Sequence, residues 1–171
     1  VFDADYEEVD FAWFSGGRLN ACFNCVDRHL RHRGEQTPII WAADEPGTYR
    51  HISYRELKHN VCRVANVLKA HGVRRGDRVC IYMPMITETA YAMLACARIG
   101  AVHSVVFGGF SAESLRDRIV DAQCRVVLTA NEGLRGGKTI PLKRITDRAI
   151  EGMSMVETVL VARRTDTEVE M

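Results

Sequence analysis

The sequence predicts an α/β protein in which a mainly parallel β-sheet has helices on both faces. Three observations support this fold class. Short apolar segments alternate with helical segments along most of the 171 residues, which is the pattern of right-handed β-α-β crossovers. The apolar segments are continuous runs, as in strands that helices cover on both sides. The chain is also long enough to enclose one substantial core.

Helices and strands are placed from periodicity and from start and stop signals. The clearest helix covers residues 54–71, because Ser53 and Glu56 have the spacing of a capping box. Apolar residues then recur at helical spacing up to Gly72, which ends the helix. Other helices are predicted over 22–33, 84–98, the segment after Ser111 and 141–150, and strands over 38–42, 50–53, 78–83, 102–106, 125–129 and 158–162.

The chain is predicted to have three parts. Residues 1–21 form an N-terminal extended segment, residues 22–164 form the α/β part of a larger domain, and residues 165–171 form a polar loop. The last segment is charged and carries neither a capping residue nor a closing element. We therefore expect a truncation point there.

Charge and composition argue against several classes of partner. The 23 basic residues nearly balance 22 acidic ones, for a net charge of +1, so no overall field attracts nucleic acid or anionic lipid. No apolar stretch reaches the roughly 18 residues of a membrane span, and the acidic N-terminus shows no signal peptide. The six cysteines are scattered, which is typical of free thiols in a reducing compartment. We therefore expect a cytoplasmic or organelle-matrix protein without nucleic-acid or membrane partners.

Two loops that follow predicted parallel strands have an unusual composition. One is residues 107–111 (FGGFS), whose paired glycines allow a backbone to approach a ligand closely. The other is residues 131–138 (NEGLRGGK), which carry Arg135 and Lys138 on either side of two glycines. An arginine can hold a phosphate with its planar fork, while a lysine acts as a point charge. Because the carboxyl ends of parallel strands share one edge, a ligand with a phosphate and a slender chain could touch both loops.

A purely structural interpretation of both loops stays open. Paired glycines also serve tight strand-to-helix turns, and Arg135 and Lys138 are compatible with solvated loop charges. The chain contains neither a Walker phosphate loop nor a G-x-G-x-x-G fingerprint. The sequence therefore does not indicate a nucleoside triphosphate site or a dinucleotide site.

No metal site and no catalytic residue are predicted within this chain. A set resembling Cys2His2 occurs in the first predicted helix, at Cys22, Cys25, His29 and His32. Ten residues of helix extend about 15 Å, whereas zinc ligands all lie within about 2.0–2.3 Å of the ion, so packing is the better interpretation. His103 lies in an apolar strand and is predicted to be a hydrogen-bonded core histidine. No nucleophile elbow or Ser/His/Asp set can be placed.

Several stretches resemble the acetyl-CoA synthetase family. Residues 13–20 (WFSGGRLN) and 24–30 (NCVDRHL) resemble its N-terminal signature. Residues 81–85 (IYMPM) and 93–111 (MLACARIGAVHSVVFGGFS) match it almost word for word, and residues 135–138 (RGGK) complete the pattern. The resemblance implies the first part of the large N-terminal domain of an adenylate-forming enzyme. Related propionyl-CoA and other acyl-CoA synthetases share parts of these motifs.

The resemblance also implies an activity for the full-length protein. It would be an AMP-forming ligase that converts acetate, ATP and CoA into acetyl-CoA, AMP and pyrophosphate through acetyl-adenylate, with Mg²⁺ accompanying ATP. In this family the two loops described above line the CoA site. The nucleotide end of CoA is expected at Arg135, Gly136, Gly137 and Lys138, and the pantetheine channel at Phe107, Gly108 and Gly109.

The family's loop for ATP phosphates, which is rich in Thr, Ser and Gly and ends in Lys-Gly, does not occur in these residues. The resemblance therefore implies that the ATP and Mg²⁺ sites lie mostly in the remainder of the same polypeptide, and that this segment is inactive alone. The alternatives are a propionyl-CoA or other acyl-CoA synthetase, and a non-catalytic α/β binding fragment.

Overall fold

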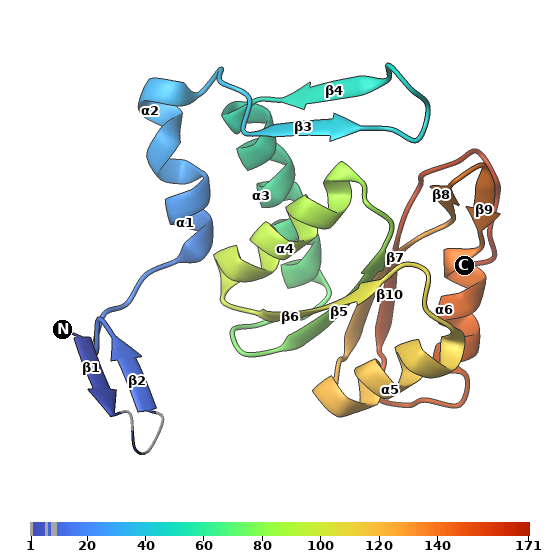
Figure 1. Ribbon diagram of the computed structural model, residues 1–171. Helices are drawn as coiled ribbons and strands as arrows, with labels where there is room; N and C mark the ends of the chain where they lie inside the picture. The colour runs from blue at the N-terminus through green and yellow to red at the C-terminus, as the bar shows by residue number, and fades with distance from the viewer. Residues whose placement is uncertain (1, 6, 8–9) are drawn as a thin grey trace.

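A four-stranded parallel sheet in the order β10-β7-β5-β6 forms the centre of the fold (Figure 1). The structure is a computed structural model that describes residues 2–5, 7 and 10–171. The strands of this sheet are β5 (Arg78–Met83), β6 (Val102–Phe107), β7 (Val126–Ala130) and β10 (Thr158–Ala162). Their positions agree with the predicted strands to within one residue, and their parallel pairing confirms the predicted fold class.

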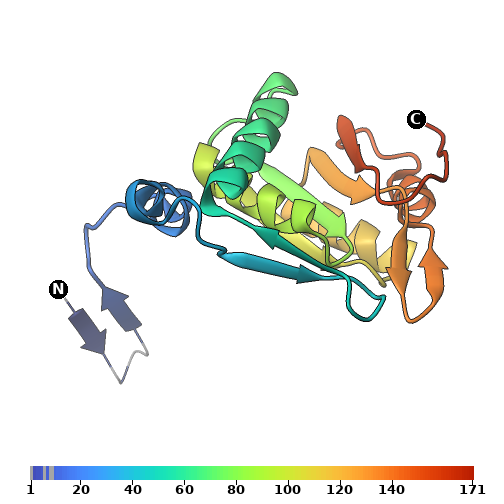
Figure 2. The same ribbon diagram turned by 90° about the horizontal axis from the view of Figure 1, so that it is seen from above.

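Helices cover both faces of the sheet (Figures 1 and 2). The central strand β5 is buried on both sides, and its successive side chains enter two different cores. Val79 and Ile81 pack with α3 (Tyr54–Ala70) and α4 (Thr87–Ile99), whereas Cys80 and Tyr82 pack with α5 (Ala112–Ala122) and α6 (Leu142–Ile150). A strand of this kind must be a continuous apolar run, which is why its sequence does not alternate.

The order of the strands creates a topological switch point between β5 and β7. The chain passes from β5 out to β6 through α4, then returns past β5 to β7 through α5, and continues outward to β10 through α6. Neighbouring strands whose connections leave in opposite directions open a crevice beyond their carboxyl ends, and ligands of open α/β sheets bind there. The loops after β5, β6 and β7 surround that position.

The helix predicted over 54–71 is confirmed as α3. The side-chain oxygen of Ser53 accepts a hydrogen bond from the backbone N–H of Glu56 at 3.2 Å, as an N-cap requires. The Glu56 carboxylate pairs with Arg50 on the preceding strand. This cap therefore also ties the helix to β4 (Tyr49–Ile52).

The prediction of a single helix over residues 22–33 is wrong. The segment divides into α1 (Ala21–Cys25), a 3₁₀ turn (Asp27–His29) and α2 (Leu30–Arg33). Val26 leaves helical geometry, with φ −125° and ψ −65°, and its side chain is fully buried. The core contact of Val26 and the ion pair that Asp27 makes with Arg98 outweigh the helical pattern of the segment.

Three antiparallel hairpins accompany the main sheet, formed by β1 (Phe2–Asp5) with β2 (Asp10–Trp13), β3 (Ile39–Ala42) with β4 (Tyr49–Ile52), and β8 (Gly133–Arg135) with β9 (Lys138–Ile140). The third hairpin corrects the prediction of a simple loop over 131–138. A two-residue turn whose central positions are both glycine is a standard hairpin connection. No helix in the described part of the chain is both long and apolar enough to cross a membrane.

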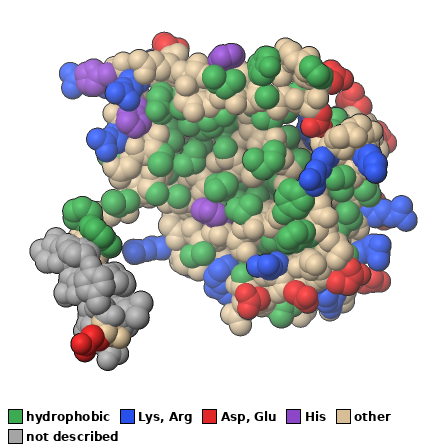
Figure 3. Space-filling view, in the orientation of Figure 1, with side chains coloured by type: hydrophobic (Ala, Val, Ile, Leu, Met, Phe, Trp, Pro, Cys, Tyr) green, Lys and Arg blue, Asp and Glu red, His purple; other side chains and the backbone are tan. Residues whose placement is uncertain are grey.

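The outer strand β6 is less buried than predicted. Val102 and Val105 are about half exposed, and His103 is only partly buried, so the prediction of a core histidine is wrong. The reason is that β6 pairs with β5 alone among the described strands. Figure 3, drawn in the orientation of Figure 1, shows hydrophobic side chains gathered across the middle of the face toward the viewer.

Candidate functional site

The two glycine-containing segments predicted to share an edge meet above the end of β5. A Cβ atom at Gly108 would lie 2.9 Å from the Met83 carbonyl oxygen, so the backbone there passes closer to β5 than any side chain allows. A Cβ at Gly133, where the β8–β9 hairpin begins, would lie 3.4 Å from the Pro84 side chain. Both segments therefore border the residues that follow β5, beside the switch point.

The side chains of the two segments also touch. The Arg135 guanidinium carbon lies 5.0 Å from the centroid of the Phe107 ring, within the range of a cation–π contact. Gly109 lies beside this pair, since a Cβ there would be 2.7 Å from the Phe107 ring and 3.5 Å from Arg135 Nη1. The absence of a side chain at this position leaves room for the contact.

The β8–β9 hairpin places two cations opposite one another. Arg135 and Lys138 are cross-strand partners on either side of the turn, and residues in such a register have Cβ atoms about 4.5–5.5 Å apart. The turn residues Gly136 and Gly137 have φ of 55° and 72°, which favours glycine at both positions. Like charges directly opposite destabilise a β-pair. An anion bound between them would remove that repulsion.

Hydrogen bonds from the core hold the loop after β6 in place. The buried Tyr82 hydroxyl donates to the carbonyl oxygen of Phe110 at 2.7 Å, and burial raises the pKa of this phenol. Ser111 caps α5 by accepting from the backbone N–H of Ser114 at 3.3 Å. The end of the loop, at Phe110 and Ser111, is therefore fixed by both the sheet and the helix.

A second arginine–aromatic contact at this edge was not predicted. Arg164 lies over the Trp41 ring at 5.2 Å, and Trp41 donates from Nε1 to the Met85 carbonyl oxygen at 2.8 Å. The buried Asn131 side chain accepts from the backbone N–H of Arg164 at 2.8 Å and so positions this residue. The signal that could have identified Arg164 is its place two residues after a predicted parallel strand.

A large cleft among the described residues has a different lining from these loops. It has a volume of about 370 Å³ and is lined by α3, α4, β7 and β10, including Arg63, Glu88 and Tyr91. The Tyr91 hydroxyl is buried and has no hydrogen-bond partner among the described residues. None of the predicted site residues lines this cleft.

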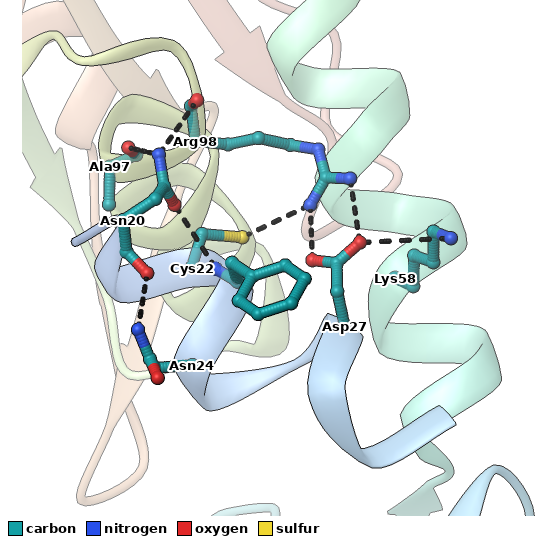
Figure 4. A network of polar contacts seen from close by, with 8 residues as sticks. Asn20, Cys22, Asn24, Asp27, Lys58, Ala97 and Arg98 are labelled. Atoms are coloured by element: carbon teal, nitrogen blue, oxygen red, sulfur yellow. Dashed lines mark hydrogen bonds and ion pairs between the residues drawn. The ribbon is translucent and has the colours of Figure 1, made fainter. Parts of the chain in front are cut away.

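A network of polar contacts at the C-terminal end of α4 has a structural role (Figure 4). Arg98 forms a bidentate pair with Asp27, at 2.7 and 2.9 Å, and donates to the Cys22 sulfur at 3.4 Å. Asn20 donates to the final carbonyl groups of α4, those of Ala97 and Arg98. The hydrogen bond from Arg98, with some help from Lys58, holds the pKa of the Asp27 carboxyl below its usual range. These contacts dock the N-terminal helical segment against α4.

Comparison with known proteins connects this geometry to a family. The profile described as "AMP-binding enzyme" matches residues 26–170. The chain belongs to the AMP-binding enzyme family. All seven predicted site residues lie inside the matched range.

Three relatives of this member of the AMP-binding enzyme family are named as acetyl-coenzyme A synthetases. The chain is 61% identical over 169 residues to acetyl-coenzyme A synthetase 2 of Pseudomonas aeruginosa, which covers 99% of this chain and 26% of that protein. It is 61% identical over 165 residues to acetyl-coenzyme A synthetase of Halorhodospira halophila, covering 96% and 26%. It is 56% identical over 171 residues to the human protein named acetyl-coenzyme A synthetase 2-like, mitochondrial, covering 100% and 25%. The chain thus spans about a quarter of the length of these relatives.

Proposed function

We propose that the full-length protein is an AMP-forming acetate–CoA ligase and that this segment supplies part of its CoA site. The family match and the names of the relatives support the ligase. The observation that carries the site is the pair of cations, Arg135 and Lys138, directly opposite one another on a tight hairpin. A hairpin that places two like charges together is well suited to a ligand with phosphate groups.

The proposed reaction has two steps. A carboxylate oxygen of acetate attacks the α-phosphorus of ATP, and pyrophosphate leaves with the electrons of the broken P–O bond. The CoA sulfur then attacks the carbonyl carbon of acetyl-adenylate. The new C–S bond replaces the C–O bond to AMP, and the thiol proton passes to solvent. This segment acts in the second step by binding CoA, and we assign no catalytic residue to it.

The two neighbouring segments would bind different parts of CoA. The guanidinium of Arg135 offers a planar set of N–H donors to phosphate oxygens, and the Lys138 ammonium adds a point charge. The backbone at Phe107, Gly108 and Gly109, which passes close to the end of β5, would line the channel for the narrow pantetheine arm. The turn glycines Gly136 and Gly137 let the hairpin hold both cations.

The other substrates are proposed to bind mostly outside these 171 residues. In the acetyl-CoA synthetase family, a loop that ends in Lys-Gly contacts the ATP phosphates. This loop does not occur in the sequence, so ATP and Mg²⁺ would be held by the remainder of the polypeptide. The six free cysteines, four of them buried, are compatible with a cytoplasmic or organelle-matrix location. A panel of carboxylates in pyrophosphate exchange would distinguish acetate from propionate as the preferred substrate.

The CoA assignment is tested by removing both cations from the full-length protein. Arg135→Ala with Lys138→Ala should raise the Michaelis constant for CoA by about 10- to 100-fold, because charge-assisted hydrogen bonds to phosphate are lost. Adenylate formation, measured by pyrophosphate exchange without CoA, should barely change.

A charge-matched control is available at the opposite edge of the sheet. Arg74 and Arg75 are exposed and precede β5, so Arg74→Ala with Arg75→Ala removes the same charge far from the proposed site. This control should leave the Michaelis constant for CoA unchanged. Equal losses in both half-reactions for the Arg135 and Lys138 variant would contradict a CoA-specific role.

A further inference from the structure

The side chain of Arg135 is supported by an aromatic ring instead of a carboxylate, as the side chain of Arg164 is by Trp41. Within the described part of the chain, its guanidinium forms no ion pair and donates no hydrogen bond, and it lies over the ring of Phe107 at 5.0 Å. Six of the other arginines, by contrast, form ion pairs with carboxylates: Arg50, Arg55, Arg98, Arg125, Arg148 and Arg163. Arg135 is therefore supported without using its hydrogen-bonding capacity.

An aromatic support has a chemical consequence that a carboxylate support lacks. A carboxylate occupies two N–H donors of the guanidinium and cancels its charge. The face of a phenyl ring attracts the cation through its quadrupole and orients the guanidinium plane. All five donors stay available for a phosphate, and the charge is not neutralised.

Phe107 is itself braced by the core. Its ring meets that of Phe110 in an edge-to-face arrangement, with centroids 5.8 Å apart and planes at 71°. The backbone of Phe110 accepts the hydrogen bond of the buried Tyr82 hydroxyl. A continuous set of contacts thus leads from the central strand of the sheet to the guanidinium of Arg135.

We infer that Phe107 is a positioning residue for Arg135: its ring holds the guanidinium in place for a phosphate of CoA while leaving every donor free. This role rests on the proposed function of the hairpin and adds to the proposed lining of the pantetheine channel by the loop backbone. It assigns the Phe107 side chain an effect that acts through Arg135 rather than through direct contact with the ligand.

A double-mutant cycle in the full-length protein tests this role. Phe107→Leu should raise the Michaelis constant for CoA about two- to fivefold, the range expected for an exposed cation–π contact. It should leave pyrophosphate exchange without CoA unchanged. In an Arg135→Ala background the same Phe107→Leu change should have no further effect, because the residue through which it acts is gone.

The conservative variant Phe107→Tyr keeps the aromatic face, and its hydroxyl can reach solvent because Phe107 is 49% exposed. It should retain the wild-type Michaelis constant for CoA. If the Phe107 ring only filled space, there would be no reason for Phe107→Tyr to perform better than Phe107→Leu. If Phe107→Leu does not fold, Phe107→Met removes the face with a flexible side chain and serves in the same cycle.

The outcomes separate this inference from the function on which it rests. If Arg135→Ala alone leaves the Michaelis constant for CoA unchanged, the proposed CoA site fails, and the role of Phe107 fails with it. If Arg135→Ala raises that constant but Phe107→Leu adds its full effect in both backgrounds, the CoA site stands and the positioning role is overturned. The positioning role is also overturned if Phe107→Leu leaves the Michaelis constant for CoA unchanged. It is likewise overturned if Phe107→Tyr raises that constant as much as Phe107→Leu does.

Discussion

Arg98 and Arg135 are held in opposite ways, at two ends of the same fold. The guanidinium of Arg98 forms a bidentate pair with Asp27 and also donates to a cysteine sulfur (Figure 4). Its pKa is raised further above its usual value, mainly by the hydrogen bond to Asp27. The guanidinium of Arg135 rests on an aromatic ring and has no carboxylate partner among the described residues.

The difference separates an arginine that stabilises the fold from one available to bind a ligand. The side chain of Arg98 is 27% exposed and that of Asp27 is 14% exposed, so removal of either would leave a charge without its main partner in a partly buried site. Arg135 and its cross-strand partner Lys138 are both exposed, and their proximity gains nothing for the fold. The partners of the two guanidinium groups thus distinguish these two arginines.

The largest expected effect comes from breaking the structural pair. Arg98→Ala in the full-length protein should lower the stability of this part of the fold by about 2–3 kcal/mol, because the Asp27 carboxylate loses its charge-assisted partner. Thermal unfolding followed by circular dichroism measures this loss. Arg135→Ala, measured in the same way, should shift the melting temperature little. A larger shift in Arg135→Ala than in Arg98→Ala would contradict the structural role assigned to Arg98.

A change in the hairpin turn should couple a smaller loss of stability to weaker CoA binding. Gly137 has φ of 72°, and a β-branched residue in that region costs about 1–2 kcal/mol. Gly137→Val should therefore lower thermal stability modestly and raise the Michaelis constant for CoA, since Arg135 and Lys138 lose their common register. Gly137→Asn, which tolerates positive φ, is the matched control and should behave like the wild type in both assays.

The Asp27–Arg98 pair should also give the fold a dependence on acid. The pKa of Asp27 in the folded protein lies below its ordinary value of 3.8, so its stabilising contribution is present above that value. As the pH falls through the folded pKa, the unfolded chain takes up the proton first and the contribution is lost. Melting temperatures between pH 6 and roughly pH 3 should fall more steeply for the wild type than for Asp27→Asn. Parallel curves would show that this pair does not contribute.

The smallest expected effect is on the salt dependence of CoA binding. Exposed charges are screened at physiological ionic strength, where the Debye length is about 8 Å. Raising the salt concentration should therefore increase the Michaelis constant for CoA a few-fold in the wild type and less in Arg135→Ala. An equal salt response in both proteins would indicate that Arg135 does not contact a phosphate.

The main sheet and its helices could be predicted because local signals and tertiary contacts agree there. The cap at Ser53 and the apolar spacing of α3 indicate the same helix, and the β-branched run at β6 appears as a strand at the predicted place. The match of the AMP-binding enzyme family over residues 26–170 agrees with the family resemblance seen in the sequence. Local patterns succeed where burial reinforces them.

The remaining features depend on contacts between residues far apart in the sequence. The break at Val26 follows from its burial and from the pairing of Asp27 with Arg98, which is 71 residues away. The aromatic support of Arg135 comes from Phe107 on a different strand connection, and periodicity contains no signal for it. The hairpin turn at Gly136 and Gly137 differs from these features: paired glycines are a local turn signal, but the segment is predicted from the sequence as a simple loop.

Direct binding of CoA to the full-length protein tests the central claim most closely. Isothermal titration of CoA into the wild type, the Arg135→Ala/Lys138→Ala variant and the Arg74→Ala/Arg75→Ala control reports affinity without catalysis. We predict a loss of about 10- to 100-fold in affinity for the first variant and no change for the control. Equal affinity in all three proteins would contradict the assignment of this hairpin to CoA.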